Sequence, residues 1–271
     1  MTAVGLPDSL ADLGPAALSA VVVAGYLVVG EPFIGHVLHR RFEGRLRTDD
    51  GARRSFYGRL LVLEWGLALL ALVVWLSAPG VDAAAVGLRW PQAWPGPVAV
   101  AATVLVLGFV VVSTRALRSG ALVQAATELR RPSHHSPPAR GRHAEPAVHA
   151  TLALLPRTTA ERRLFTLVGV TAGVCEEWLY RGFLLAVVAA VGGGGLPEPV
   201  LIAIGALAFG LAHAYQGLAG IVSTGVLGGV MAGLYLGTGS LLLPVVLHAL
   251  IDLRFLLVPA SALPDVVRRP T

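Results

Sequence analysis

Ionisable side chains form three short groups inside apolar runs of the C-terminal half of the chain. The groups are Glu176, Glu177 and Arg181; Phe209 and His213; and His248 and Asp252. A charged side chain at the centre of a bilayer costs about 2.5–3.5 kcal/mol on insertion scales. An apolar run that contains several charged side chains therefore indicates that they have a function. The three groups therefore predict a buried functional site.

The first group contains one carboxylate more than its arginine can neutralise. In a helix, Glu177 and Arg181 lie four residues apart on one face, whereas Glu176 points about 100° away. Burial and a like-charged neighbour make an unpaired carboxylate more basic, which is how a general base that works near neutral pH arises. An ion pair that only locks helix packing is the alternative for Glu177 and Arg181, but it leaves Glu176 unexplained.

The two histidine groups also have the spacing of one helical turn. Phe209 and His213 share a helix face, although a lone histidine at a helix end is more often an interfacial anchor. Asp252 is placed to orient the His248 imidazole and fix its tautomer, as carboxylates do for catalytic or metal-bound histidines. A polar pair that holds two helices together is the alternative.

Few other ionisable groups lie within apolar runs; Glu31 and Glu64 are the acidic ones. Because the three groups are concentrated in three C-terminal runs, we predict that a helix bundle brings them together around one cavity.

The composition predicts an all-α fold, a polytopic membrane bundle of about seven helices, with eight as the alternative. The chain is 55% hydrophobic and 14% charged, far from the averages of soluble proteins. Its one cysteine, Cys175, excludes an intrachain disulfide and a cysteine-based metal cluster. The expected spans are Pro15–His36, Arg59–Ala78, Pro97–Leu117, Leu164–Val191, Val200–Ala214, Gly217–Leu236 and Leu241–Val258.

We divide the chain into N-terminal membrane helices with an arginine-rich loop (1–130), a linker (131–156), a helical core that carries the site (157–260) and a tail (261–271). The linker is rich in Pro, His and Arg and has no apolar helical stripe, which indicates a flexible cytoplasmic segment. Its histidines are His134, His135, His143 and His149. A histidine-rich metal tract is the alternative there.

All 21 basic residues are arginines, and their distribution predicts the orientation. Seven lie between residues 40 and 59 and nine between 115 and 163, whereas the loop 77–96 holds only Arg89. The positive-inside rule then places the N-terminus outside and the C-terminus in the cytoplasm. We therefore attribute the excess positive charge to loops beside a lipid bilayer, and we do not predict nucleic-acid binding. The arginine, alanine, glycine and valine bias is typical of a GC-rich bacterium, which predicts a bacterial plasma membrane.

The ordered motifs EExxxR, FxxxH and HxxxN or HxxxD, each on its own membrane helix, resemble the CPBP family of intramembrane proteases, also called Abi, which includes the type II CAAX prenyl endopeptidases. The small residues before the Glu pair and the Arg-Gly-Phe after it are similar to the family as well. The resemblance covers roughly Leu155 to Leu257, and the first three spans match only in being apolar.

The resemblance implies hydrolysis of a peptide bond in a membrane-embedded peptide or protein. It implies Glu176 as the general base on a water that His213 helps to hold, with Glu177 and Arg181 positioning the site. His248 and Asp252 would stabilise the oxyanion or complete a metal site.

A Zn²⁺ ion held by Glu176, His213 and His248 is one option, because such ligand sets leave a position open for water. A metal-free mechanism is also proposed for the family, and the HExxH pattern of soluble metalloproteases is absent. No cofactor is therefore assigned with certainty, and Zn²⁺ stays open.

The substrate is not determined by these residues. Prenylated proteins are not expected in a bacterium, and bacterial relatives are linked to bacteriocin maturation and self-immunity or to cleavage of membrane-anchored peptides. A catalytically idle scaffold or bacteriocin-immunity protein of the same fold is the main alternative, and a proton-coupled transporter is a third.

One expectation concerns depth. If its helix begins at Glu161, Glu176 lies about 22 Å along the axis, whereas His213 is expected near the cytoplasmic end of its span. The two meet only if the turn from Glu161 to Leu167 leaves the membrane core, with a threonine at 158 or 159 as helix cap.

Overall fold

The computed structural model describes residues 4–46, 48–120 and 152–263. These residues form helices and connecting turns, with no strand among them. The α-helices are α1 (Ala17–Gly25), α2 (Glu31–Leu46), α3 (Ala52–Leu76), α4 (Pro97–Arg118), α7 (Thr159–Glu177), α8 (Leu184–Val191), α9 (Glu198–Ala212), α10 (Gly217–Thr238) and α11 (Leu242–Leu253). The predicted all-α fold is confirmed for this part of the chain.

Two π-helical turns join helices into longer rods. Turn η2 (Tyr26–Gly30) connects α1 to α2, and turn η3 (Trp178–Phe183) connects α7 to α8. Short 3₁₀ turns complete the fold: η1 (Leu10–Ala16), η4 (Ala214–Gln216), η5 (Arg254–Leu257) and η6 (Ala260–Ala262). π-Turns inside α-helices occur frequently at functional sites, and both of these lie next to acidic residues.

Four helical segments of the described chain are long and apolar enough to cross a membrane: Leu10–Leu46, Ala52–Leu76, Pro97–Arg118 and Ala214–Thr238. Glu198–Ala212 is a shorter apolar helix. The predicted count of seven is not confirmed, because the rod Thr159–Val191 carries the charges of the site and the last helix has only 12 residues. Large apolar side chains such as Val73, Leu105 and Phe109 are exposed on the outer faces, as expected for a surface that meets lipid.

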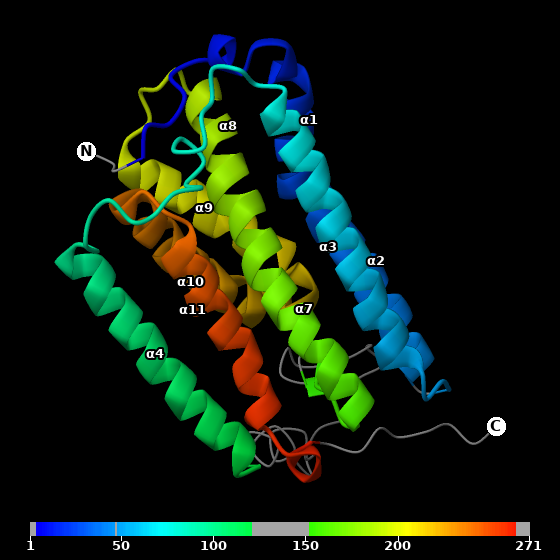
Figure 1. Cartoon of the computed structure of the whole chain (residues 1–271). Helices are drawn as coiled ribbons and strands as arrows, with labels where there is room; N and C mark the ends of the chain where they lie inside the picture. Colours follow the sequence, from blue (N-terminus) through cyan, green and yellow to red (C-terminus); the bar gives the residue numbers. More distant parts are fainter. Residues whose placement is uncertain (1–3, 47, 121–151, 264–271) are drawn as a thin grey trace, which may run out of the picture.

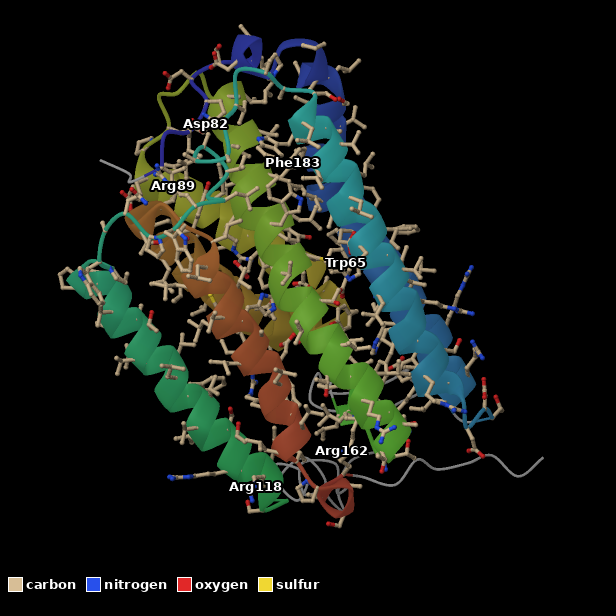
Figure 2. All side chains as sticks on the ribbon, in the orientation of Figure 1. Trp65, Asp82, Arg89, Arg118, Arg162 and Phe183 are labelled. Carbon is tan, nitrogen blue, oxygen red and sulfur yellow. The ribbon has the colours of Figure 1, made fainter. Side chains whose placement is uncertain are left out.

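The arginine-rich ends of the helices lie at the same end of the bundle. Figure 1 shows α2, α4 and α7 with their arginine-bearing ends at the bottom, and the turn at Gly192–Gly195 at the top. Arg118 and Arg162 mark the lower end in Figure 2, and Asp82 and Arg89 lie toward the upper end. The arginine-rich segments of the sequence thus lie together at one end of the folded bundle.

Helices α9 and α11 end within the bundle. Their 15 and 12 residues correspond to about 22 Å and 18 Å, less than the roughly 30 Å of a hydrocarbon core. His213 follows directly after α9, close to the end of the predicted span Val200–Ala214. Thr158 caps the N-terminus of α7 and accepts a hydrogen bond from the Glu161 backbone N–H at 3.2 Å, as predicted for a threonine at 158 or 159.

The last residues of the predicted linker are packed against the bundle. Leu152 and Leu155 are buried, and the Arg53 guanidinium donates to the Ala153 carbonyl at 3.0 Å. The flexible linker predicted for 131–156 therefore does not extend to residues 152–155. The remainder, with its four histidines, and residues 264–271 of the tail lie outside the described residues.

Close packing of α7 against α11 depends on glycine. A Cβ atom added at Gly173 would lie 3.0 Å from Ala249 Cβ and 3.1 Å from the Val245 carbonyl. Small residues permit this kind of close approach between membrane helices. The same crossing brings His248 of α11 to Glu177 of α7.

We expect Gly173→Val to lower the free energy of unfolding by about 1–3 kcal/mol, because the larger side chain forces α7 and α11 apart. Thermal unfolding of the purified protein in detergent measures the effect. The matched control is Gly108→Val in α4, where an added Cβ meets nothing within 4 Å. Equal unfolding temperatures for the two variants would contradict the packing argument.

Candidate active site

A cavity of about 440 Å³, open on one side near the exposed Val62 and Leu63, lies between the helices, and residues of α2, α3, α7, α9 and α11 line it. Its polar lining includes Tyr26, Glu31, Glu64, Glu176, Tyr180, His213, Tyr215, Gln216, His248 and Asp252. Most of the remaining wall is apolar. The predicted convergence of Glu176, His213 and His248 on one cavity is therefore present in the structure.

Glu177 lies behind the cavity wall, fully buried, between two cationic or hydrogen-bonding partners. Arg181 Nη1 donates to Glu177 Oε1 at 2.9 Å, and His248 Nδ1 donates to the same oxygen at 2.7 Å. The helical pairing of Glu177 with Arg181 that the spacing predicted is present. Because an ionised carboxylate only accepts hydrogen bonds, His248 must carry its proton on Nδ1.

Arg181 connects η3 to two further helices. Its Nη2 donates to the Gly228 carbonyl of α10 at 3.3 Å, and its Cζ lies 4.3 Å from the centroid of the Phe209 ring in α9. A guanidinium over an aromatic face is a favourable cation–π contact. Arg181 and Glu177 therefore connect η3 to α9, α10 and α11 through direct contacts.

His248 presents its other nitrogen to the carboxylates of the cavity. His248 Nε2 lies 4.0 Å from Glu176 Oε2 and 3.8 Å from Asp252 Oδ2, both longer than a hydrogen bond. Asp252 was expected to orient this ring, but Glu177 does so in the structure. The reason is the α7–α11 crossing, which brings a residue 71 positions away closer than the neighbour one helical turn along.

His213 is oriented by the backbone of its own helix. Its Nδ1 donates to the Phe209 carbonyl at 2.9 Å; a carbonyl oxygen can only accept, so the proton is on Nδ1. The Phe209 ring packs against both imidazoles, with centroid distances of 4.8 Å to His213 and 5.8 Å to His248. Both histidines thus have Nδ1 engaged, and Nε2 is the nitrogen left for chemistry.

Glu176 is the carboxylate without a strong partner. Its Oε2 is inaccessible to solvent and makes no hydrogen bond, and its side chain is 19% exposed. It lines the cavity, whereas its neighbour Glu177 does not. The surplus carboxylate predicted from the sequence is therefore the one that faces the open space.

The sequence reasoning left Glu31 and Glu64 out of the site, although both line the cavity. The signal was their position as carboxylates within apolar runs, which by itself suggests function. Tyr215 and Gln216, in the 3₁₀ turn after His213, also line the cavity. None of these four residues lies close enough to Glu176 in the sequence for helical spacing to predict the contact.

We tested whether the side chains fit a metal ion. Among residues 4–46, 48–120 and 152–263, no group of three or more His, Cys, Asp or Glu side chains is placed to hold one. The set Glu176, His213 and His248 therefore does not form a metal site as placed, and we derive no step through a metal.

Comparison with known proteins bears on the C-terminal part of the chain. No curated protein and no solved structure matches this chain. The segment 159–254, which carries every site residue from Glu176 to Asp252, matches the family described as type II CAAX prenyl endopeptidase Rce1-like, and the resemblance read from the motifs is confirmed there.

Proposed function

We propose that this protein is an intramembrane endopeptidase in which Glu176 activates a water molecule for attack on a peptide bond. The observation that carries the proposal is the placement of Glu176 of α7, His213 at the end of α9 and His248 of α11 on one cavity. The match of this segment to a protease family supports the reaction type.

In the proposed mechanism, Glu176 removes a proton from a water that also donates a hydrogen bond to His213 Nε2. The resulting hydroxide adds to the carbonyl carbon of the substrate. His248, when it carries a proton on Nε2, donates to the oxyanion that forms. Glu176 then returns the proton to the leaving nitrogen as the C–N bond breaks, which yields one carboxylic acid and one amine.

Glu177 and Arg181 act as positioning residues in this scheme. Glu177 fixes the tautomer and direction of the His248 ring, and Arg181 keeps Glu177 ionised and in place. A hydrogen-bond donor held in place before the reaction contributes about 10²- to 10³-fold in rate. In this scheme the Glu177–Arg181 pair holds the His248 ring in place as that donor.

The substrate in this proposal is a peptide or protein segment within the bilayer. The exposed apolar faces of the bundle support a multi-pass membrane protein, and the clustered arginine ends support the cytoplasm as the side on which they lie. The N-terminus is then outside and the C-terminus in the cytoplasm.

The test is cleavage of a library of apolar peptides by purified protein in detergent, compared with Glu176→Ala and His213→Ala. We expect cleavage by the unaltered protein and strong loss in both variants. Equal cleavage in all three preparations would refute the assignment. If the unaltered protein cleaves nothing, the catalytically idle scaffold becomes the better account.

A further inference from the structure

Two carboxylates from the N-terminal half of the chain line the cavity and have no part in the proposed chemistry. Glu64 of α3 and Glu31, the first residue of α2 after the π-turn η2, line the same cavity as Glu176. Both lie outside the segment 159–254 that matches the protease family. Their function must therefore be argued from their own surroundings.

Two tryptophans join α3, close to Glu64, to the rod formed by α7 and η3. Trp65 Nε1 donates to Thr171 Oγ1 at 3.2 Å, and Trp178 Nε1 donates to the Ala68 carbonyl at 3.1 Å. Figure 2 shows Trp65 near the middle of the bundle. Both bonds lie within four residues of Glu64 on its C-terminal side, so they fix the backbone of α3 that carries it against the rod.

The electrostatic environment of Glu64 is negative. Glu31, Glu176 and Asp252 all lie close enough to repel a charge on it. Glu64 Oε2 is inaccessible to solvent and has no hydrogen-bond partner, whereas Glu31 has the Tyr26 hydroxyl beside it. A buried carboxylate without a partner is costly, so Glu64 and Glu31 together require a positive charge or a proton.

Among the described residues, the cation nearest the carboxylates of α7 and α11 is His248, which lies by Glu176 and Asp252, and no ion pair joins a cationic side chain to Glu31 or Glu64. The lining contains no arginine, and Arg181 is engaged behind the wall with Glu177. The carboxylates are not arranged to hold a metal ion with neighbouring ligands. An organic cation carried in by the substrate would complement these carboxylates, and protonation of both is the competing outcome that the binding test distinguishes.

We propose that Glu31 and Glu64 form a subsite that binds the ammonium or guanidinium group of a basic side chain in the substrate. This inference rests on the proposed endopeptidase function and makes it more specific: the preferred substrate is an apolar segment with a lysine or arginine near the cleaved bond. The apolar remainder of the wall contacts the rest of that segment.

The test measures binding, not hydrolysis. Two labelled peptides of about 20 mainly apolar residues, identical except for a central lysine or norleucine, are titrated against the full-length Glu176→Gln protein in detergent, which cleaves neither. We expect the lysine peptide to bind about tenfold more tightly or better, as a charge-assisted contact allows. Adding Glu64→Gln or Glu31→Gln should reduce that preference by a similar factor.

Three comparisons make the result specific. Glu64→Asp, which keeps the charge, should retain the preference for lysine. Glu198→Gln at the start of α9, outside the cavity lining, should leave it unchanged. Equal affinity of the two peptides, or equal loss of both in Glu64→Gln, would overturn the subsite and indicate a protonated or purely structural carboxylate.

The binding result is independent of the proposed reaction. If the lysine peptide binds preferentially through Glu64 but the unaltered protein cleaves no peptide, the subsite stands and the endopeptidase function fails. If the protein cleaves peptides but does not distinguish lysine from norleucine, the subsite alone fails.

Discussion

Replacing Glu176 by glutamine is expected to lower the rate of peptide hydrolysis about 10²- to 10⁴-fold, the usual contribution of a positioned general base. Glutamine has nearly the same shape but cannot take a proton from water. Since Glu176 Oε2 has no hydrogen-bond partner, the substitution breaks no internal bond there, and the unfolding temperature should not fall. Single-turnover cleavage of a peptide found in the library measures the rate.

Two controls separate loss of the base from general damage. Glu198→Gln removes a carboxylate from the N-terminus of α9, away from the cavity lining, and should cleave at the normal rate. The affinity of Glu176→Gln for an uncleaved peptide should remain close to that of the unaltered protein. A Glu176→Gln protein that cleaves as fast as Glu198→Gln would remove Glu176 from the mechanism.

Spacing along single helices predicted the local part of the site. Residues four apart share a helix face, and the pairing of Glu177 with Arg181 follows directly. The surplus of one carboxylate identified Glu176 as the group free to face the cavity. The high cost of charges in an apolar environment then required the three groups to meet, and the structure places Glu176, His213 and His248 on one cavity.

Contacts between helices could not be predicted in the same way. The partner of His248 was expected to be Asp252, yet it is Glu177, because the close crossing at Gly173 decides the distance. The contribution of Glu31 and Glu64 depends on how α2 and α3 pack against α7, and no motif records that packing.

The number of spans was uncertain for a related physical reason. The rod Thr159–Val191 is too rich in charge, and α11 too short, to resemble an ordinary membrane helix. The charges within the rod include Glu176, Glu177 and Arg181, so the residues of the candidate site themselves reduce the apolar character by which a membrane span is recognised.

Arg181→Met is expected to lower the free energy of unfolding by about 3–5 kcal/mol, because it leaves the buried Glu177 carboxylate without its cation. Both side chains are 0% exposed, so water cannot replace the lost partner. Chemical denaturation in mixed micelles measures the change. Adding Glu177→Gln to Arg181→Met should recover part of the loss, since glutamine removes the stranded charge and still accepts the hydrogen bond from His248.

The chain provides a matched control for this prediction in an exposed pair with the same spacing. Arg45 and Asp49 also form an ion pair four residues apart, but their side chains are 42% and 36% exposed. Arg45→Met should therefore lower the free energy of unfolding far less than Arg181→Met. If Arg181→Met is as mild as Arg45→Met, or if the double variant is no more stable than Arg181→Met alone, Glu177 is not held as a buried anion. The reason for the fixed Nδ1 proton on His248 would then fail, and with it the geometry that aims Nε2 at the substrate.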